Sequence, residues 1–182
     1  GTIRVRSETD VWPLYFLHTL AATADLIEGG PDRRWKVAPA GKDFLGQARA
    51  SLQVLDLFIV WWTLVDWTIV SPLGDLAGSV TPEFPGLVLH YLLDLPVGET
   101  VPFAPLADRL LREAGLMAPP VFLEDLGPVG QMMVAWMTIY PLLWFRAVEV
   151  EHEMGQLLGH EIPTLAMLRV TPFGRADRKS VV

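Results

Sequence analysis

Histidine and glutamate residues gather near the C-terminal end of the chain, in the segment "EVEHEMGQLLGHE" at residues 149–161. Imidazole and carboxylate groups are common zinc ligands. The candidate ligands are His152, Glu153, His160 and Glu161. The zinc-protease pattern needs a second histidine four residues after the first, but Gln156 occupies that position. Apolar–polar alternation over residues 148–154 indicates instead a half-buried strand, with His152 partly buried on one face. We therefore predict no metal and no other cofactor.

Two aspartates in an apolar stretch, Asp56 and Asp66, are candidates for a general acid and a general base. A polar stripe in the same stretch fits the wetted edge of one helix better, and it consists of Arg49, Gln53, Asp56 and Thr63. His18 and His90 lie in apolar helical sequence, so we interpret both as histidines at a helix surface or core edge. The sequence has no lysine-bearing phosphate loop, no Gly-x-Ser-x-Gly elbow and no cysteine. We therefore predict that the protein is not an enzyme and has no small-molecule substrate.

The composition favours a folded protein with a large core. Of the 182 residues, 51% are hydrophobic and 19% are charged, and the net charge is −7. Residues 52–70 approach the length of a membrane span, but two acids at mid-helix would cost about 5–7 kcal/mol on insertion. Residues 132–145 carry no charge but are too short to cross a bilayer. Residues 1–10 lack the apolar core of a signal peptide. We therefore expect a soluble, cytoplasmic protein without membrane contact.

The first part of the chain predicts a helix, a hairpin and a second helix. Leucines at helical spacing indicate a helix over residues 10–25, with Asp10 as its cap. A turn at residues 29–32 precedes the short strand "RRWKV", and Pro39 then favours a helix start. We predict that this helix is long and apolar and runs from Pro39 to about Val70.

The end of the chain repeats part of this pattern. "RRWKVAPAGKDFL" at residues 33–45 is echoed by "MLRVTPFGRADR" at residues 167–178, with Pro39 aligned to Pro172 and both glycines in register. A buried helix over residues 128–145, kinked near Pro141, precedes the second copy. We expect hairpins at about residues 26–37 and 147–170, each followed by a helix that begins at the aligned proline.

The segment upstream of the second copy adds a helix over residues 86–95, a strand at "ETVPF" and a helix over residues 104–116. Helix, strand, helix, helix, hairpin is the element order of a winged-helix domain. "LAATADLIEGGPDRRWKVAPAGKDFL" resembles the recognition helix, wing and closing T-x-x-G segment of winged-helix proteins, and "WFRAVEVEHE…LRVTPFGR" resembles a second such end. The resemblance covers roughly residues 1–46 and 86–178.

The resemblance implies a mainly α fold with small β-hairpins (α+β), in which tandem winged-helix-like modules pack on a long central apolar helix. We place the first module and the central helix in residues 1–70, a linker in residues 71–85 and the second module in residues 86–182. The first copy lacks the leading helices of the pattern. Either the sequence is a piece of a longer protein, or other parts of this chain complete the first module.

Two functions follow from this reading. Winged-helix proteins often bind DNA, and the candidate contacts here are Arg33, Arg34, Lys36 and Lys42. The helix expected at residues 10–25 has no Arg, Lys, Gln or Asn to read bases, so such binding would be weak and indifferent to sequence. We favour an interaction module that binds a protein partner or a second copy of the chain. The candidate partner surface is Trp61, Trp62, Met132, Met133 and Trp136.

Overall fold

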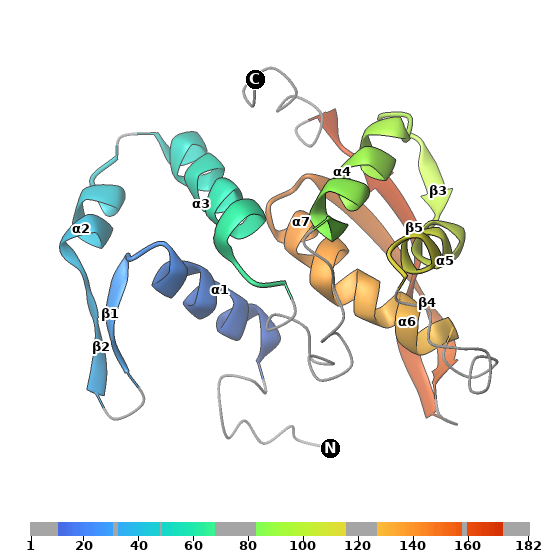
Figure 1. Cartoon of the computed structure of the whole chain (residues 1–182), viewed down its shortest axis with the longest axis horizontal. Helices are drawn as coiled ribbons and strands as arrows, with labels where there is room; N and C mark the ends of the chain where they lie inside the picture. Colours follow the sequence, from blue (N-terminus) through green and yellow to red (C-terminus); the bar gives the residue numbers. More distant parts are fainter. Residues whose placement is uncertain are drawn as a thin grey trace. The chain divides into compact units, whose positions relative to one another are not determined.

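The protein has an α+β fold with two small antiparallel sheets (Figure 1). The computed structural model describes residues 11–30, 33–47, 49–67, 83–115, 127–157 and 160–172. The chain divides into two compact units, residues 1–72 and residues 73–182. Most of the predicted linker, residues 71–82, lies outside the described residues.

The first unit is a helix, a hairpin and two further helices (Figure 1). Its elements are α1 (Trp12–Thr23), β1 (Ile27–Gly30), β2 (Arg33–Val37), α2 (Pro39–Leu45) and α3 (Ala50–Leu64). The strands β1 and β2 pair antiparallel, with Ile27 opposite Val37. The predicted hairpin and the helix start at Pro39 are therefore confirmed. Asp10, the predicted cap of the first helix, lies outside the described residues.

The prediction of one long helix from Pro39 to about Val70 is wrong. The helix breaks after α2, where the N–H of Gly46 donates to the carbonyls of Lys42 and Asp43, and Arg49 is extended (φ −118°, ψ 106°). The Gln53 side chain of α3 then donates to the Phe44 carbonyl at 2.7 Å, which satisfies a group that a continuous helix would have satisfied internally. A helix that continued through Gly46 would also be destabilised, because glycine loses more conformational entropy than other residues when it enters a helix.

The core of the first unit is an aromatic cluster centred on Trp61. This indole is 0% exposed and stacks on Trp67, with ring centroids 5.0 Å apart and an interplanar angle of 6°. The Trp67 Nε1 donates to the Trp61 carbonyl at 3.2 Å, and Phe16 of α1 meets the Trp61 ring edge-on. Burial of these large rings is the main stabilising contribution to the packing of α1 against α3.

The second unit places helices on a three-stranded antiparallel sheet (Figure 1). Its elements are α4 (Phe84–Asp94), β3 (Thr100–Pro102), α5 (Phe103–Glu113), α6 (Gly127–Val134), the π-helical segment η3 (Ala135–Ile139), α7 (Tyr140–Trp144), β4 (Val148–Leu157) and β5 (His160–Val170). The strand order is β3-β5-β4. Helix α5 packs against α6 and β5, and α7 packs against β4. The predicted second hairpin is confirmed, whereas a helix after Pro172 falls on residues outside those described.

The irregularity predicted near Pro141 takes the form of the π-helical segment immediately before it. Proline has no N–H, so the carbonyl of Met137 cannot receive the usual hydrogen bond from residue 141. The helix widens there, and the N–H of Tyr140 donates to the carbonyl of Ala135, five residues back. Such segments shift the side chains that follow, and they are frequent at functional sites.

The long hairpin leaves the core before it ends. Val148 at its base is buried, whereas His152 and Met154 are exposed. A bulge leaves Ala166 as an extra residue in β5, between the pairs Glu151–Met167 and His152–Leu165. The prediction that His152 is partly buried is therefore wrong, because the helices cover only the base of the hairpin.

Helices α1 and α7 end in the same way. A residue in the left-handed conformation follows each helix: Asp25 (φ 55°) after α1 and Arg146 (φ 59°) after α7. The next residue closes the turn by donating its N–H five residues back, from Leu26 to Ala21 and from Ala147 to Leu142, at 2.9 and 2.8 Å. This Schellman-type ending sets the angle at which each hairpin leaves its helix.

The hairpin bases are also closed in the same way. The N–H of Ala38 donates to the Leu26 carbonyl at 2.9 Å, and the N–H of Thr171 donates to the Ala147 carbonyl at 3.0 Å. In the first unit Gly41 lies against this closure, since a Cβ at that position would be 2.1 Å from the Leu26 oxygen. The repeat in the sequence thus corresponds to a repeated backbone pattern of helix end, hairpin and closing hydrogen bond.

Helices α4 and α5 are joined by a polar cluster. The Tyr91 hydroxyl donates a hydrogen bond to Glu113 Oε1, and the Arg109 guanidinium lies 4.8 Å above the Tyr91 ring. The Arg109 Nε is 3.4 Å from the same Glu113 oxygen. The hydrogen bond from Tyr91, followed by the charge of Arg109, lowers the pKa of Glu113 below its ordinary value.

Replacing Gly41 with alanine tests the hairpin closure. We expect Gly41→Ala to destabilise the protein by about 2 kcal/mol or more, because the methyl group would overlap the Leu26 backbone. The control is Gly86→Ala in α4, where no atom lies within 4 Å of the added methyl. That change should be neutral or stabilise by up to about 1 kcal/mol. Urea unfolding measures both, and equal effects at the two positions would contradict the closure.

The lowered pKa of Glu113 predicts a pH dependence of stability. A carboxyl whose pKa is lower in the folded state stabilises that state above its unfolded pKa, and the contribution is lost as pH falls through the folded pKa. We expect Glu113→Gln to unfold at lower urea concentration than the wild type at pH 7, with the difference shrinking below pH 4. Glu99→Gln, at an exposed position, should show no such convergence. A difference that is independent of pH would refute the prediction.

Candidate functional site

The histidines and glutamates near the end of the chain form no metal centre in the part of the molecule that is described. No group of three or more His, Cys, Asp or Glu residues there could hold a metal ion. His152 Nε2 lies 3.0 Å from the Tyr140 hydroxyl, and the two rings are stacked with centroids 5.9 Å apart. His160 is exposed at the start of β5. Burial raises the pKa of Tyr140, so its hydroxyl stays protonated near neutral pH.

Asp56 and Asp66, which were considered as an acid–base pair and interpreted as the edge of one helix, do not lie on the same helix. Asp56 lies on α3, where it accepts a hydrogen bond from Gln47 at 3.4 Å, whereas Asp66 follows the end of that helix. Both carboxylates are exposed. His18 meets the Trp35 ring edge-on at 4.2 Å, and exposed His90 lies 3.7 Å from Asp94. These contacts fit the surface roles expected of the two histidines.

Two of the residues expected at a partner surface belong to the core. Trp61 is 0% exposed and Met133 is 6% exposed, so neither side chain can contact a partner of the folded chain. The reason is the same in both units: the apolar helix turns its largest side chains toward the neighbouring helices. Trp62 is half-buried beside Trp61, whereas Met132 and Trp136 are half-buried at the wall of a cavity.

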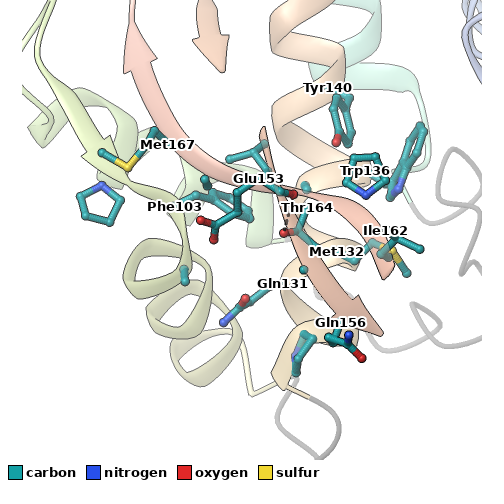
Figure 2. A pocket seen from close by; sticks show the side chains of 18 residues that line it. Phe103, Gln131, Met132, Trp136, Tyr140, Glu153, Gln156, Ile162, Thr164 and Met167 are labelled. Atoms are coloured by element: carbon teal, nitrogen blue, oxygen red, sulfur yellow. Dashed lines mark hydrogen bonds between the residues drawn. The ribbon is translucent and has the colours of Figure 1, made fainter. Parts of the chain in front are cut away.

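This cavity, which we call the hairpin cavity, lies in the second unit between the start of α5, the helix α6–η3 and the long hairpin (Figure 2). Its volume is about 570 Å³, within the range of small-molecule sites. The apolar wall is made by Phe103, Met132, Trp136, Ile162, Leu165 and Met167. The polar side chains at its surface are Gln131, Tyr140, Glu153, Gln156 and Thr164.

Most of the polar groups of the cavity have partners within the protein. Gln131 Nε2 donates to Asp108 Oδ1 at 2.9 Å. Thr164 Oγ1 donates to the Glu153 carbonyl at 3.3 Å (Figure 2). The side chain of Glu153 carries the only charge among the lining residues that the structure describes. The sequence offers Glu153 as a candidate metal ligand but carries no sign of the cavity, because the walls of the cavity come from segments up to 65 residues apart and share no local motif.

A second pocket, which we call the leucine pocket, lies in the first unit between α1, the hairpin, α2 and α3. Its volume is about 280 Å³, and the described residues that line it are all apolar: Leu17, Leu20, Ala21, Leu26, Ile27, Val37, Gly41, Phe44, Leu45 and Leu57. Three of these side chains are exposed at the rim, Leu17 by 56%, Val37 by 44% and Leu45 by 67%. Helix α3 adds further exposed apolar side chains at Leu52, Val54, Ile59 and Leu64.

The candidate DNA contacts lie on the first unit. Arg34 and Lys36 on β2 and Lys42 on α2 are exposed, and the Arg33 side chain is outside what the structure describes. The described helix and hairpin that correspond to these elements in the second unit offer no such basic cluster. Residues 127–145 contain no Lys or Arg, and β4 exposes Glu149, Glu151 and Glu153, the first of which forms an ion pair with Arg169.

Comparison of the chain with protein-family models, with curated proteins and with solved structures finds no match. Within the described ranges, no helix combines the length and the apolar character that crossing a membrane requires. The two pockets and the distribution of charge are therefore the features that bear on function.

Fluorescence anisotropy with random duplex DNA tests the basic hairpin. We expect negligible binding at 150 mM salt and weak binding, with a steep salt dependence, below 50 mM. Arg34→Ala combined with Lys36→Ala should weaken every duplex alike and lower the salt slope by about two. Arg112→Ala, which removes an exposed charge from the second unit, should leave the slope unchanged. Low-micromolar binding at 150 mM salt would instead favour a DNA-binding function.

Proposed function

We propose that this chain is a non-enzymatic interaction module that associates with a second copy of itself through the leucine pocket. The observation that carries the proposal is an open pocket whose described lining is apolar throughout and whose rim exposes Leu17, Val37 and Leu45. Apolar surface left in water costs about 25 cal/mol per Å². Covering this pocket and its rim is therefore favourable, and contiguous apolar surface of this kind is typical of protein interfaces.

The size of the leucine pocket suits an anchoring side chain better than a large ligand. A volume of about 280 Å³ accommodates one bulky apolar group, and interface energy concentrates where such a group fills a pocket. The described lining offers no polar side chain that would orient a small polar molecule. A polypeptide needs no such group, because its backbone can satisfy its own hydrogen bonds outside the pocket.

We propose a second copy of the chain as the occupant of the leucine pocket, because the first unit itself exposes apolar side chains of the kind that fill such a pocket. The same unit carries exposed Leu52, Ile59 and Leu64 on α3, which are the type of side chain that an apolar pocket accepts. Two copies related by a two-fold axis would each contribute a pocket and the side chains that fill it. Apart from the polar stripe of Gln53, Asp56 and Thr63, helix α3 is apolar, and a broad apolar surface is usual for helices that are covered on more than one side.

We infer in addition that the second unit is a winged-helix-like module. Two observations support this inference: the order α4, β3, α5, α6–α7, β4, β5, and the strand order β3-β5-β4. Winged helices serve as docking and dimerisation domains as well as DNA readers, and the acidic hairpin of this unit disfavours the phosphate backbone. Contact with DNA through the first hairpin is the alternative function, and the salt titration described above discriminates between the two.

Sedimentation equilibrium tests the association. We expect the wild type to be a dimer at tens of micromolar, and Leu45→Glu to be monomeric, because a carboxylate at the rim would be buried without a partner in the dimer. Leu45 is 67% exposed, so the change should leave the fold intact, as checked by circular dichroism. The matched control, Leu89→Glu on exposed α4 surface of the second unit, should remain dimeric. A monomeric wild type at 100 µM, or equal dissociation of both variants, would overturn the proposal.

A further inference from the structure

We propose that the hairpin cavity of the second unit is a binding site for an apolar organic cation, a small molecule with an aromatic or aliphatic body and one positive charge. This site is separate from the leucine pocket of the first unit, so the proposal does not depend on self-association. It extends the function beyond protein contacts, since the sequence alone indicates no small-molecule site.

The walls of the cavity define the apolar part of the ligand. Side chains of Phe103, Met132, Trp136, Ile162 and Met167 enclose the space from both the helical side and the hairpin side (Figure 2). A volume of about 570 Å³ holds a molecule of several rings rather than a single side chain. Methionine is unbranched and polarisable, so Met132 and Met167 can adapt to ligands of different outline.

The charged side chains around the cavity indicate the sign of the charge on the ligand. Glu153 is the one charged side chain among the described lining residues, and no Lys, Arg or His is among them. Figure 2 shows the Glu153 side chain between Phe103 and Thr164, at the surface of the cavity. The exposed carboxylate of Glu151 lies two residues away along β4. A cation entering the cavity therefore meets a negative potential, and an anion is repelled.

The aromatic rings add a second attraction for a cation. Trp136 and Tyr140 lie with ring centroids 4.6 Å apart at 48°, and both line the cavity. The negative faces of indole and phenol attract organic cations, and Trp is the strongest of the aromatic side chains in this respect. The π-helical segment changes the helical spacing between Ala135 and Tyr140, and thereby the direction in which these two rings point.

Isothermal titration calorimetry with two ions of the same shape and opposite charge tests the site. The probes are tetraphenylphosphonium chloride and sodium tetraphenylborate, each titrated into the full chain in sodium buffer. We expect tetraphenylphosphonium to bind with a dissociation constant in the micromolar range and tetraphenylborate to bind at least ten-fold more weakly. Equal affinity for both ions, or no heat of binding from either, would overturn the proposal.

Matched variants locate the binding. Glu153→Gln keeps the shape of the side chain and should weaken tetraphenylphosphonium binding by only about five-fold, because Glu153 is exposed and its charge is screened by solvent. Glu151→Gln removes the same charge from the same strand but not from the lining, and should change the affinity less than two-fold. Trp136→Leu should weaken binding about ten-fold. Equal effects of the two glutamate variants, or wild-type affinity in Trp136→Leu, would refute the assignment; unfolding curves confirm that each variant is folded.

Discussion

The first unit depends on one short backbone contact, the hydrogen bond from the N–H of Ala38 to the carbonyl of Leu26. It joins Ala38, directly after β2, to Leu26, directly before β1 and a few residues after the end of α1. Gly41 therefore lies so close to the Leu26 oxygen that a side chain at position 41 would overlap it. The direction of α2, and with it the leucine pocket between α1 and α2, follows from this close approach.

The second unit uses the same closure, from Thr171 to Ala147, for a much longer hairpin. Each strand of this hairpin continues well past the part that the helices cover, so its far half is not packed against the core. The hairpin cavity lies where the hairpin separates from α6 and η3. A shorter hairpin would end before it could form this wall, so the cavity is a consequence of hairpin length as well as of side-chain identity.

The two units distribute their charges and apolar groups differently, and this separates their proposed roles. The first unit exposes basic side chains on its hairpin beside a pocket lined by apolar residues. The second unit has an acidic hairpin next to a cavity with one carboxylate. Of the large hydrophobic side chains that are exposed among the described residues, Leu89 and Met154 belong to the second unit, whereas nine belong to the first. This difference is why we propose apolar association for the first unit and recognition of a cation for the second.

The sequence by itself determined the local structure wherever backbone chemistry acts over a few residues. Proline at Pro39 favours a helix start and Pro141 disrupts a helix, because in both cases the ring restricts φ and removes an N–H. The alternation of apolar and polar residues predicts the strands of the hairpins, because successive side chains of a strand point to opposite faces. These expectations hold without reference to distant residues. The repeat around Pro39 and Gly41 likewise indicated that a second hairpin precedes Pro172.

Only the tertiary structure decided which apolar side chains are buried and where surfaces enclose a space. At the helix break after α2, the side chain of Gln53 from α3 donates a hydrogen bond to the Phe44 carbonyl. Trp61 is in the core because Phe16 and Trp67 surround it, whereas the equally apolar Leu45 is exposed because nothing described covers it. Both side chains are apolar and both lie on helices, so residue type alone does not separate them. The difference lies in contacts between residues far apart along the chain, and burial is a property of those contacts rather than of the residue type.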